Sequence, residues 1–450
     1  MTRSSRPVGF PAVAAVVLAA AVLHAAGAPV ATSPDERQLP RKMHSRMSEL
    51  PTVRVGREGA DILGVDNRAL QAAVDYVANL GGGTVEVGPG EYLMRDSLHL
   101  RGNVAVRGTP GKTVLRKAAG AASALAKDGD YGEEQVTLAD ASGFDVGCGI
   151  AVWDKGSGGF HTTVATITGR RGNTVSISRP LNADCMASNG AQAATVFPVV
   201  SGVDVDGVRV EHLIVEGAKD ANVNLNGCRG AGIYLYRGFG AAIDHCTVRN
   251  FNGDGISFQQ SNDVTVADCF SLNNAGLGLH PGSGSQRPTV RGCTARGNGD
   301  DGLYLCWRVR DGLFENNVLE ANGGHGISIG HKDTDNLLRN NRVTANGRDG
   351  ILFRNESEGI AAHRNTLEGN VIENNGQKAE VAAIRVQGQT NGLVFRNNTL
   401  RDTRTGSERR QPTGIRVEKD AGDVTLNGNV IEGNTPVNDQ RLASPVSSKE

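Results

Sequence analysis

Short apolar stretches recur through the middle of the chain, and each begins at a glycine and ends in a turn rich in glycine and asparagine. The repeated segments are NGDGISF (252–258), AGLGLHP (275–281), GDDGLYL (299–305), GGHGISI (323–329) and GRDGILF (347–353). Their aligned glycines lie 23 or 24 residues apart. A period of that length with short strands predicts a solenoid whose coils stack at the strand spacing of ~4.8 Å. The pattern therefore predicts an all-β fold, a parallel β-helix.

Polar and small residues follow the same period. One column holds Cys269, Cys293, Asn317, Asn341 and Asn365, and another holds Asn274, Asn298, Asn322, Asn346 and Asn370. Because a buried amide must find a hydrogen-bond partner, we expect inward ladders in which each asparagine bonds to its equivalent one coil away. The cysteines are interpreted as small packing residues that replace asparagine in the ladder.

The seven cysteines do not indicate a disulfide framework. Their number is odd, and Cys246, Cys269 and Cys293 recur with the repeat. Nor do the cysteines show the CxxC spacing or the clustering with histidine that is typical of zinc ligands. The sequence therefore predicts no metal site.

Other patterns flank and interrupt the repeat. Apolar residues at helical spacing in 67–80 (NRALQAAVDYVANL) predict a helix that caps the open end of the solenoid. Alternating patterns that break the period predict a β-rich insertion at 136–198. The predicted organisation is a signal peptide (1–28), a polar leader (29–53), the N-terminal cap with the first coils (54–135), the insertion (136–198), the β-helix repeats (199–433) and a flexible tail (434–450).

The N-terminal segment indicates export. Arg3 and Arg6 precede the apolar run AVAAVVLAAAVLHAAGA, which is too short and too rich in alanine for a membrane span and predicts a signal peptide cleaved between Ala25 and Ala31. We expect a secreted or periplasmic protein with no integral membrane segment after cleavage. A net charge of -1 argues against nucleic acid as a partner, and 60 glycines with 4% aromatic residues indicate a core of small stacked side chains.

The run ALQAAVDYV…GGGTVEVGPGEYLM, followed by coils that start NGDGI, GDDGL and GHGI, resembles the pectin-lyase-like superfamily over roughly residues 55–430. The resemblance implies a right-handed parallel β-helix. That superfamily contains hydrolases, lyases, esterases, epimerases and non-catalytic tailspikes, so the fold alone assigns no reaction.

Three segments resemble motifs of the polygalacturonase family of inverting glycoside hydrolases. GHGISIG (324–330) is similar to its histidine motif, GDDGLYL (299–305) to its paired-aspartate motif and NGDG (252–255) to its Asn-Thr-Asp-Gly motif. The resemblance implies that Asp301 shares acid and base roles with Asp300 or Asp254, and that His325 adjusts their ionisation. Asp254 and Asp301 are expected two coils apart, ~10 Å at the backbone, near the ~6.5–9.5 Å carboxyl separation of inverting enzymes. In the alternative interpretation, Asp-Gly is a structural feature of the strand start.

A second resemblance is to the family of chondroitinase B and alginate lyases. Its Lys-x-x-x-Asn-x-x-Arg-x-Asn stretch, followed one coil later by Leu-x-Leu-Arg, is matched in order by Lys332, Asn336, Arg339, Asn341 and Arg354. The resemblance implies β-elimination on a uronic acid, with Lys332 as base and Arg354 as acid or carboxylate clamp. It would also imply a calcium ion, although His325 and Ile327 stand where that family has acidic ligands.

Alternation along the strands places further side chains on one outer face. The exposed columns are His280, Tyr304, Ser328 and Leu352; Gly282, Cys306, Gly330 and Arg354; and Gly284, Arg308, Lys332 and Glu356. Aromatic rings stack on sugars and ionic groups bind acidic ones, so the candidate substrate-binding residues are His280, Tyr304, Trp307, Arg308, His331 and Glu356. Solvated histidines and loop anchors are the ordinary alternatives.

These patterns together predict an exported carbohydrate-active enzyme whose partner is an acidic polysaccharide, cleaved in a cleft over residues 252–356. Hydrolysis is favoured over elimination because three segments resemble hydrolase motifs. No cofactor is predicted, except calcium if the reaction is elimination. A non-catalytic glycan-binding solenoid is the remaining alternative.

Overall fold

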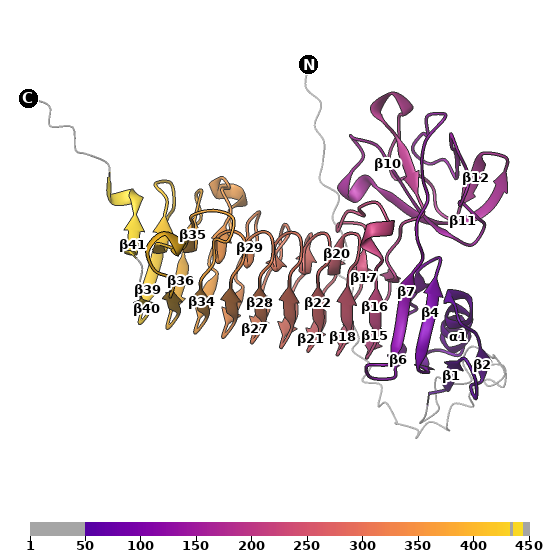
Figure 1. Ribbon diagram of the computed structural model, residues 1–450, viewed down its shortest axis with the longest axis horizontal. Coiled ribbons are helices and arrows are strands. Elements are labelled where there is room, and N and C mark those ends of the chain that lie inside the picture. Colours follow the sequence, from indigo (N-terminus) through magenta and orange to yellow (C-terminus); the bar gives the residue numbers. More distant parts are fainter. Residues whose placement is uncertain (1–49, 433–434, 444–450) are drawn as a thin grey trace, which may run out of the picture.

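The computed structural model describes residues 50–432 and 435–443, and these form a long solenoid of stacked coils with a separate sheet standing on its N-terminal part (Figure 1). Neighbouring strands within each sheet of the solenoid are parallel, for example Ile327 beside Ile351 and Ser328 beside Leu352. The prediction of a parallel β-helix is confirmed.

Three parallel sheets make up the solenoid. The first has 13 strands in the order β2 (Ile62–Leu63), β1 (Thr52–Gly56), β3 (Gly83–Val87), β6 (Val104–Gly108), β15 (Arg209–Glu211), β18 (Ala242–Asp244), β21 (Thr265–Ala267), β24 (Thr289–Arg291), β27 (Leu313–Glu315), β30 (Leu337–Arg339), β33 (Thr366–Glu368), β36 (Leu393–Arg396) and β39 (Val424–Asn427). The second has 11 strands, β4 (Gly90–Met94), β7 (Thr113–Lys117), β16 (Ile214–Glu216), β19 (Thr247–Arg249), β22 (Phe270–Leu272), β25 (Thr294–Arg296), β28 (Val318–Glu320), β31 (Arg342–Thr344), β34 (Val371–Glu373), β37 (Thr399–Arg401) and β40 (Val430–Glu432).

The third sheet, called the β20 sheet below, holds the segments singled out in the sequence. Its 11 strands are β5 (Leu98–His99), β14 (Val200–Val203), β17 (Ala231–Tyr236), β20 (Asp254–Gln259), β23 (Leu279–Gly282), β26 (Leu303–Tyr304), β29 (Ile327–Ile329), β32 (Ile351–Phe353), β35 (Ala382–Val386), β38 (Thr413–Val417) and β41 (Thr435–Asp439). Strand β41 pairs with β38, so the chain continues the solenoid past the boundary predicted at residue 434. The predicted signal peptide and most of the leader lie outside the described residues.

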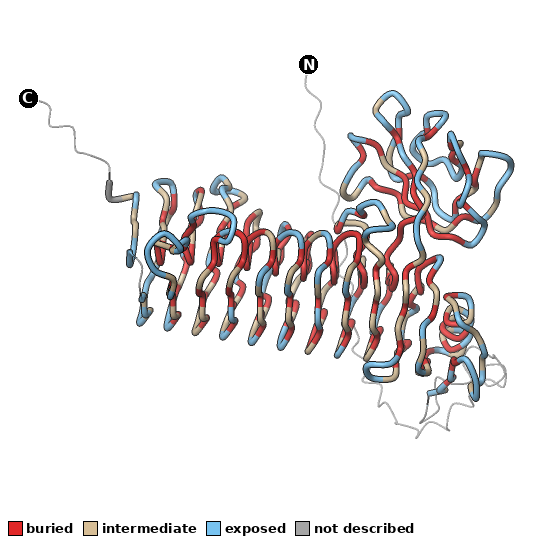
Figure 2. Tube along the Cα trace, in the orientation of Figure 1, coloured by how far each residue is buried: buried red, intermediate tan, exposed pale blue. Residues whose placement is uncertain are grey.

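The interior of the solenoid is lined by one apolar residue after another in register. Ile256, Leu279, Leu303, Ile327 and Ile351 on the β20 sheet are all buried, and Figure 2 shows buried segments along the coils. Turns between sheets repeat a left-handed residue at the same place in successive coils, among them Asn273, Ala321, Ala345 and Asn374. Asparagine and glycine tolerate that conformation best, which explains why the turns are rich in both.

Two long asparagine ladders and a shorter third one run through the interior. The amide of Asn341 donates to Oδ1 of Asn370 and accepts from the amide of Asn317, both at 3.0 Å. The sequence prediction paired Asn341 with Asn365 and is wrong at that step, because this coil spans 29 residues and includes the 3-10 turn Glu358–Ile360. Asn365 instead accepts from Asn336 at 3.0 Å, in a third ladder.

The second ladder shows the same change of spacing. It runs through Asn274, Asn298, Asn322, Asn346, Asn375 and Gln411, so Asn375 replaces the predicted Asn370. Cysteines stand in for asparagine at the start of the first ladder, where the N–H of Cys293 donates to Oδ1 of Asn317 at 2.9 Å. That part of the prediction is confirmed.

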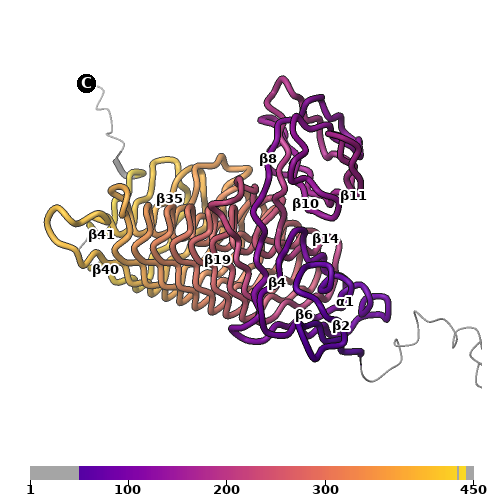
Figure 3. The backbone as a smooth tube through the Cα atoms, turned by 45° about the vertical axis from the view of Figure 1, so that its right-hand side comes forward, coloured from indigo at the N-terminus to yellow at the C-terminus, as the bar shows by residue number. Residues whose placement is uncertain are grey.

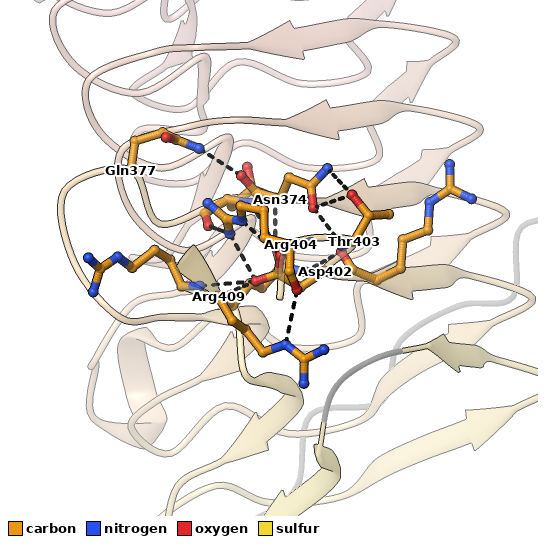
Figure 4. A network of polar contacts seen from close by, with 10 residues as sticks. Asn374, Gln377, Asp402, Thr403, Arg404 and Arg409 are labelled. Carbon is orange, nitrogen blue, oxygen red and sulfur yellow. Dashed lines mark hydrogen bonds and ion pairs between the residues drawn. The ribbon is translucent and has the colours of Figure 1, made fainter. Parts of the chain in front are cut away.

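A longer excursion between β37 and β38 is anchored by Asp402 (Figure 4). Its carboxylate accepts hydrogen bonds from the side chain of Arg404 and from the backbone N–H of Gln411. Arg404 in turn donates to the carbonyl of Asn375 at 2.6 Å. These contacts place Gln411 where it ends the second ladder.

Helix α1 (Asn67–Asn79) closes the N-terminal end, as predicted for 67–80. Asp66 caps it by accepting the N–H of Arg68 at 3.0 Å. Its buried residues Leu70, Val74 and Val77 face the first coils. Within the described residues, no helix is long and apolar enough to cross a membrane.

The insertion is a six-stranded antiparallel sheet in the order β8 (Ala122–Ala124), β13 (Gln192–Ala194), β10 (Gly149–Trp153), β11 (Thr163–Arg171), β12 (Thr174–Ile177) and β9 (Gln135–Thr137). It begins at Ala122, before the boundary predicted at residue 136. It has its own apolar core around Phe144, Ile150 and Val175. Figures 1 and 3 show it beside the first strands of the β20 sheet, while α1 lies at the N-terminal end of the solenoid.

Candidate functional site

The residues just before the repeated glycines lie at the starts of strands on the β20 sheet, where they are buried. Asp254 and Asp301 are 5% exposed and Asp349 is 3% exposed. Each accepts the N–H of the residue one coil ahead through Oδ1: Leu277 for Asp254 at 2.9 Å, His325 for Asp301 at 2.5 Å and Ala382 for Asp349 at 2.9 Å. These aspartates therefore share one structural contact, and any further role must come from what surrounds each of them.

Asp301 differs from its equivalents through its neighbour. Asp300 is exposed, and a Cβ placed on Gly324 would overlap Oδ1 of Asp301 and lie 2.7 Å from Oδ1 of Asp300. The two carboxylates thus converge on the space left by the missing side chain of Gly324. Burial first, and then the charge of Asp300, raise the pKa of Asp301 to about 7.

His325 lies one coil beyond Asp301 and is 9% exposed. Burial and the nearby charges of Arg348, Arg385 and Arg354 lower its pKa to about 4, so the imidazole is neutral near pH 7. Its Nδ1 lies 3.5 Å from Oδ2 of Asp349 without forming a hydrogen bond. His325 therefore contacts Asp301 through its backbone N–H, and its side chain lies near three arginines.

Asp254 is placed differently from the predicted catalytic arrangement. Its Oδ2 lies 2.6 Å from Nδ1 of His280, and both side chains are less than a tenth exposed. A Cβ on Gly227 would overlap that oxygen, so the loop before β17 covers the pair directly. Burial acts to lower the pKa of His280, but hydrogen bonds to Asp254 and Cys306 outweigh burial and raise that pKa to about 10. The predicted roles of Asp254 and His280 require side chains on an open face, and neither side chain lies on one.

Tyr304 and Arg354 are in contact on the outer face of the β20 sheet, called the outer face below. The guanidinium of Arg354 lies over the tyrosine ring, 4.4 Å from its centre. It donates to Oγ of Ser328 at 2.9 Å and to the buried carboxylate of Asp333 at 3.1 Å. Burial raises the pKa of Tyr304 to about 12. Arg354 is therefore held by contacts with three neighbouring side chains.

The remaining predicted binding residues lie at the ends of the same strands. Trp307 is 46% exposed and stacks on His331, with ring centres 4.5 Å apart. Nδ1 of His331 lies 3.7 Å from Oε2 of Glu356. Arg308 is exposed and Lys332 is half-buried. The structure thus brings Trp307, His331 and Glu356 together on successive coils.

A second surface, not predicted from the sequence, lies where the insertion meets the first coils. A pocket of about 470 Å³ is bordered by Arg101, Arg179, Arg229, Arg237, Tyr234 and Tyr236, with other residues of β11 and of the segment 96–101. The guanidinium of Arg229 lies 4.9 Å from the ring centre of Tyr236, and Arg237 lies 4.8 Å from it on the same ring. Tyr234 stands in the same outward column as Tyr304, three strands earlier.

Sequence reasoning also missed a cluster of sulfur and nitrogen atoms. Cys228, His280 and Cys306 each offer one atom, and these atoms lie within 4.8 Å of one another. The repeat places His280 and Cys306 on neighbouring coils, but Cys228 belongs to a loop outside the repeat, so no spacing rule could add it.

Comparisons with known proteins agree with this architecture. A family described as "Right handed beta helix region" matches residues 211–367. The chain is a right-handed parallel β-helix, the fold that its resemblance to the pectin-lyase-like superfamily implied. No curated protein matches the sequence.

Several solved structures are similar to this chain at low identity. The polygalacturonase from Erwinia carotovora subsp. carotovora is 14% identical, with a TM-score of 0.50, over 87% of this chain and 98% of that one. ORF18 of Geobacillus virus E2 is 12% identical, with a TM-score of 0.53, over 85% of this chain and 62% of that one. The A-module of the Azotobacter vinelandii mannuronan C-5 epimerase AlgE6 is 15% identical, with a TM-score of 0.49, over 83% of this chain and 94% of that one. At these identities the likeness concerns the fold.

Proposed function

We propose that this protein is an exported carbohydrate-active enzyme that hydrolyses glycosidic bonds of an acidic polysaccharide on the outer face of the β20 sheet. The observation that supports this most directly is the Asp300–Asp301 pair, in which one carboxyl is buried with a pKa raised to about 7 and its neighbour is exposed. Carboxyl groups in contrasting environments are the usual basis for acid and base assignments.

Asp301 is the proposed general acid. Because its pKa is near 7, a large fraction of the carboxyl is protonated at neutral pH, as proton donation to a glycosidic oxygen requires. Its Oδ1 already accepts the N–H of His325, which leaves Oδ2 to transfer the proton. The fixed Oδ1 also holds the side chain in one orientation.

Asp300 is the proposed base that activates water. It is exposed and adjacent, and its charge contributes to the raised pKa of Asp301. His325 is a positioning residue in this scheme, because it contacts Asp301 through its backbone N–H. Asp254 is not part of the scheme, since it lies beneath Gly227 and pairs with His280.

The preference for an acidic polymer rests on the cations beside the pair. Arg348 and Arg354 lie close enough to Asp301 for their charges to oppose the rise in its pKa. Together with Arg385, they also lower the pKa of His325. Guanidinium groups bind carboxylates well because they offer two parallel N–H donors. The arginine-lined pocket over β14 and β17 would extend the same preference toward the N-terminal coils.

The test compares two matched aspartates. Asp301→Asn and Asp349→Asn both keep an oxygen that can accept the N–H of the next coil, but only the first removes the proposed acid. On a panel of uronate and neutral polysaccharides, we expect new reducing ends without ultraviolet absorbance. Turnover should fall at least ~100-fold in Asp301→Asn, the usual scale of general acid catalysis, and change little in Asp349→Asn.

Other outcomes would point to the alternatives. Products that absorb in the ultraviolet, lost in both Lys332→Ala and Arg354→Ala, would replace hydrolysis by elimination. Binding to polysaccharide with neither product would make the chain a glycan-binding solenoid. Equal activity of Asp301→Asn and the parent would remove Asp301 from the mechanism.

A further inference from the structure

We propose that Cys228, His280 and Cys306 form a binding site for a thiophilic divalent cation, with Zn²⁺ as the cation that best fits two sulfur donors and one nitrogen donor. The site is distinct from the proposed hydrolytic pair and does not depend on it. The three residues come from the loop before β17, from β23 and from the segment just after β26, so the ion would link three separate parts of the chain.

The spacing of the donor atoms fits tetrahedral zinc. The three atoms lie within 4.8 Å of one another. With Zn–S near 2.3 Å and Zn–N near 2.0–2.1 Å, neighbouring ligand atoms in a tetrahedral site are about 3.5–3.8 Å apart. Side-chain movements of about 1 Å would therefore bring the thiols and the imidazole to bonding positions.

His280 is already oriented as a metal ligand. Its Nδ1 lies 2.6 Å from Oδ2 of Asp254, while Oδ1 of the same carboxylate accepts the N–H of Leu277 at 2.9 Å. A carboxylate fixed on one imidazole nitrogen orients the other toward the ion and makes it a stronger donor. Nε2 is thus the proposed ligand atom, and a bound cation would displace the contact that Nε2 makes with the amide nitrogen of Gln259 at 3.2 Å.

The loop containing Cys228 is held over this pair by contacts of its own. The carbonyl of Gly227 accepts from Oγ of Ser257 at 2.8 Å, and the carbonyl of Cys228 accepts from the hydroxyl of Tyr234 at 2.8 Å. Any side chain at Gly227 would overlap Asp254, so glycine is required for the loop to bring Cys228 this close.

A second observation concerns Gln259. Its Nε2 lies 3.2 Å from Nε2 of His280, and its Oε1 is buried without a hydrogen-bond partner among the described residues. Three protein ligands leave the fourth tetrahedral position to water, as in catalytic rather than closed zinc sites. The amide of Gln259 is the polar group beside His280 that can bond to such a water.

Binding would convert both cysteines to thiolates and release their protons to solvent. The ion would then fasten the loop 222–230 to the coils of β23 and β26, next to Tyr304, whose ring centre is 5.5 Å from that of His280. The expected consequence is a more stable N-terminal border of the outer face.

The test uses the full-length exported chain, kept reduced, dialysed against Zn²⁺ and then freed of unbound metal. We expect about one zinc per chain in the parent and in the control Cys293→Ala, whose cysteine is buried in the ladder. Cys228→Ser and Cys306→Ser should each retain less than about a tenth of that content, and Asp254→Asn should bind about 10- to 100-fold more weakly. Co²⁺ in place of Zn²⁺ should give sulfur-to-metal charge-transfer absorption that is absent from both serine variants.

Two results would overturn the proposal. One is a parent that holds no zinc, or holds as much as the folded Cys228→Ser variant does. The other is thiol titration of the exported protein that finds Cys228 and Cys306 joined in a disulfide, since that bond would consume both sulfur ligands.

Discussion

Arg354 and Tyr304 stand two strands apart on the β20 sheet, and the guanidinium of the first lies over the ring of the second at 4.4 Å. The same guanidinium reaches the carboxylate of Asp333, which is fully buried. A buried carboxylate that loses its cation is strongly destabilised.

We therefore expect Arg354→Met, which keeps the apolar stem, to lower the free energy of unfolding by about 3–5 kcal/mol in denaturant titrations. The double variant with Asp333→Asn should recover part of that loss, because the uncompensated charge is gone. If the single variant is as stable as the parent, the ion pair contributes nothing and Arg354 is free for another role.

The first asparagine ladder predicts a large effect at Asn341. Asn341→Leu leaves the backbone N–H of Asn317 without its partner and removes one hydrogen bond from each of the side-chain amides of Asn317 and Asn370. The carbonyl of Phe314 also loses a donor, and each unpaired buried group costs about 1–3 kcal/mol. We expect the free energy of unfolding to fall by about 2–6 kcal/mol, measured by chemical unfolding. Cys293→Asn is the matched opposite change, since it extends the ladder by one amide, and it should be neutral or stabilising.

The raised pKa of Asp301 predicts a pH-dependent difference in stability. Because the pKa is about 7 in the folded protein against an ordinary 3.8, the folded state binds the proton more tightly than the unfolded chain. The stabilisation is complete below about pH 4 and is lost as the pH rises through about 7. The asparagine side chain does not titrate in this range. The melting temperature of Asp301→Asn should therefore equal that of the parent near pH 4 and exceed it near pH 8. If the difference in melting temperature between the two proteins is the same at all pH values, the carboxyl of Asp301 titrates normally.

If the pocket beside the insertion binds the substrate, substitutions in its wall should weaken substrate affinity without slowing turnover. Arg229→Gln and Arg179→Gln each remove a cation from its wall. Without one charge-assisted hydrogen bond to an acidic polymer, KM should rise about tenfold or more while kcat stays nearly unchanged. Arg170→Gln is the control, because Arg170 lies on β11 but outside the pocket wall. A fall in kcat with constant KM would place the chemistry in the pocket instead.

The regular part of the fold was predictable because each coil repeats one set of constraints. Glycine at the bend, an apolar strand and a buried amide recur together up to Gly350, and the register of Ile327 with Ile351 follows from counting. Counting fails at Asn365, because the turn at 358–360 lengthens one coil without disturbing the ladder on either side.

The candidate site was predictable only in part. Alternation placed Tyr304 and Arg354 on one face, but it could not determine that Asp254 lies under Gly227 or that Asp301 bonds to the backbone of His325. The arginine pocket depends on contacts between segments such as 96–101 and the insertion, and no local pattern encodes their distance.

Each coil of the solenoid pairs only with the coils before and after it, as β29 does with β26 and β32. A whole coil can therefore be removed or duplicated as a unit, leaving every remaining strand and amide with an equivalent partner. Deletion of 323–346, for example, would bring Asn322 against Asn375 with the ladder intact, while shifting the arginines of the later coils one step toward Tyr304. The length of the outer face of the β20 sheet and the charges that line it can thus change by whole-coil events, with no redesign of the interior.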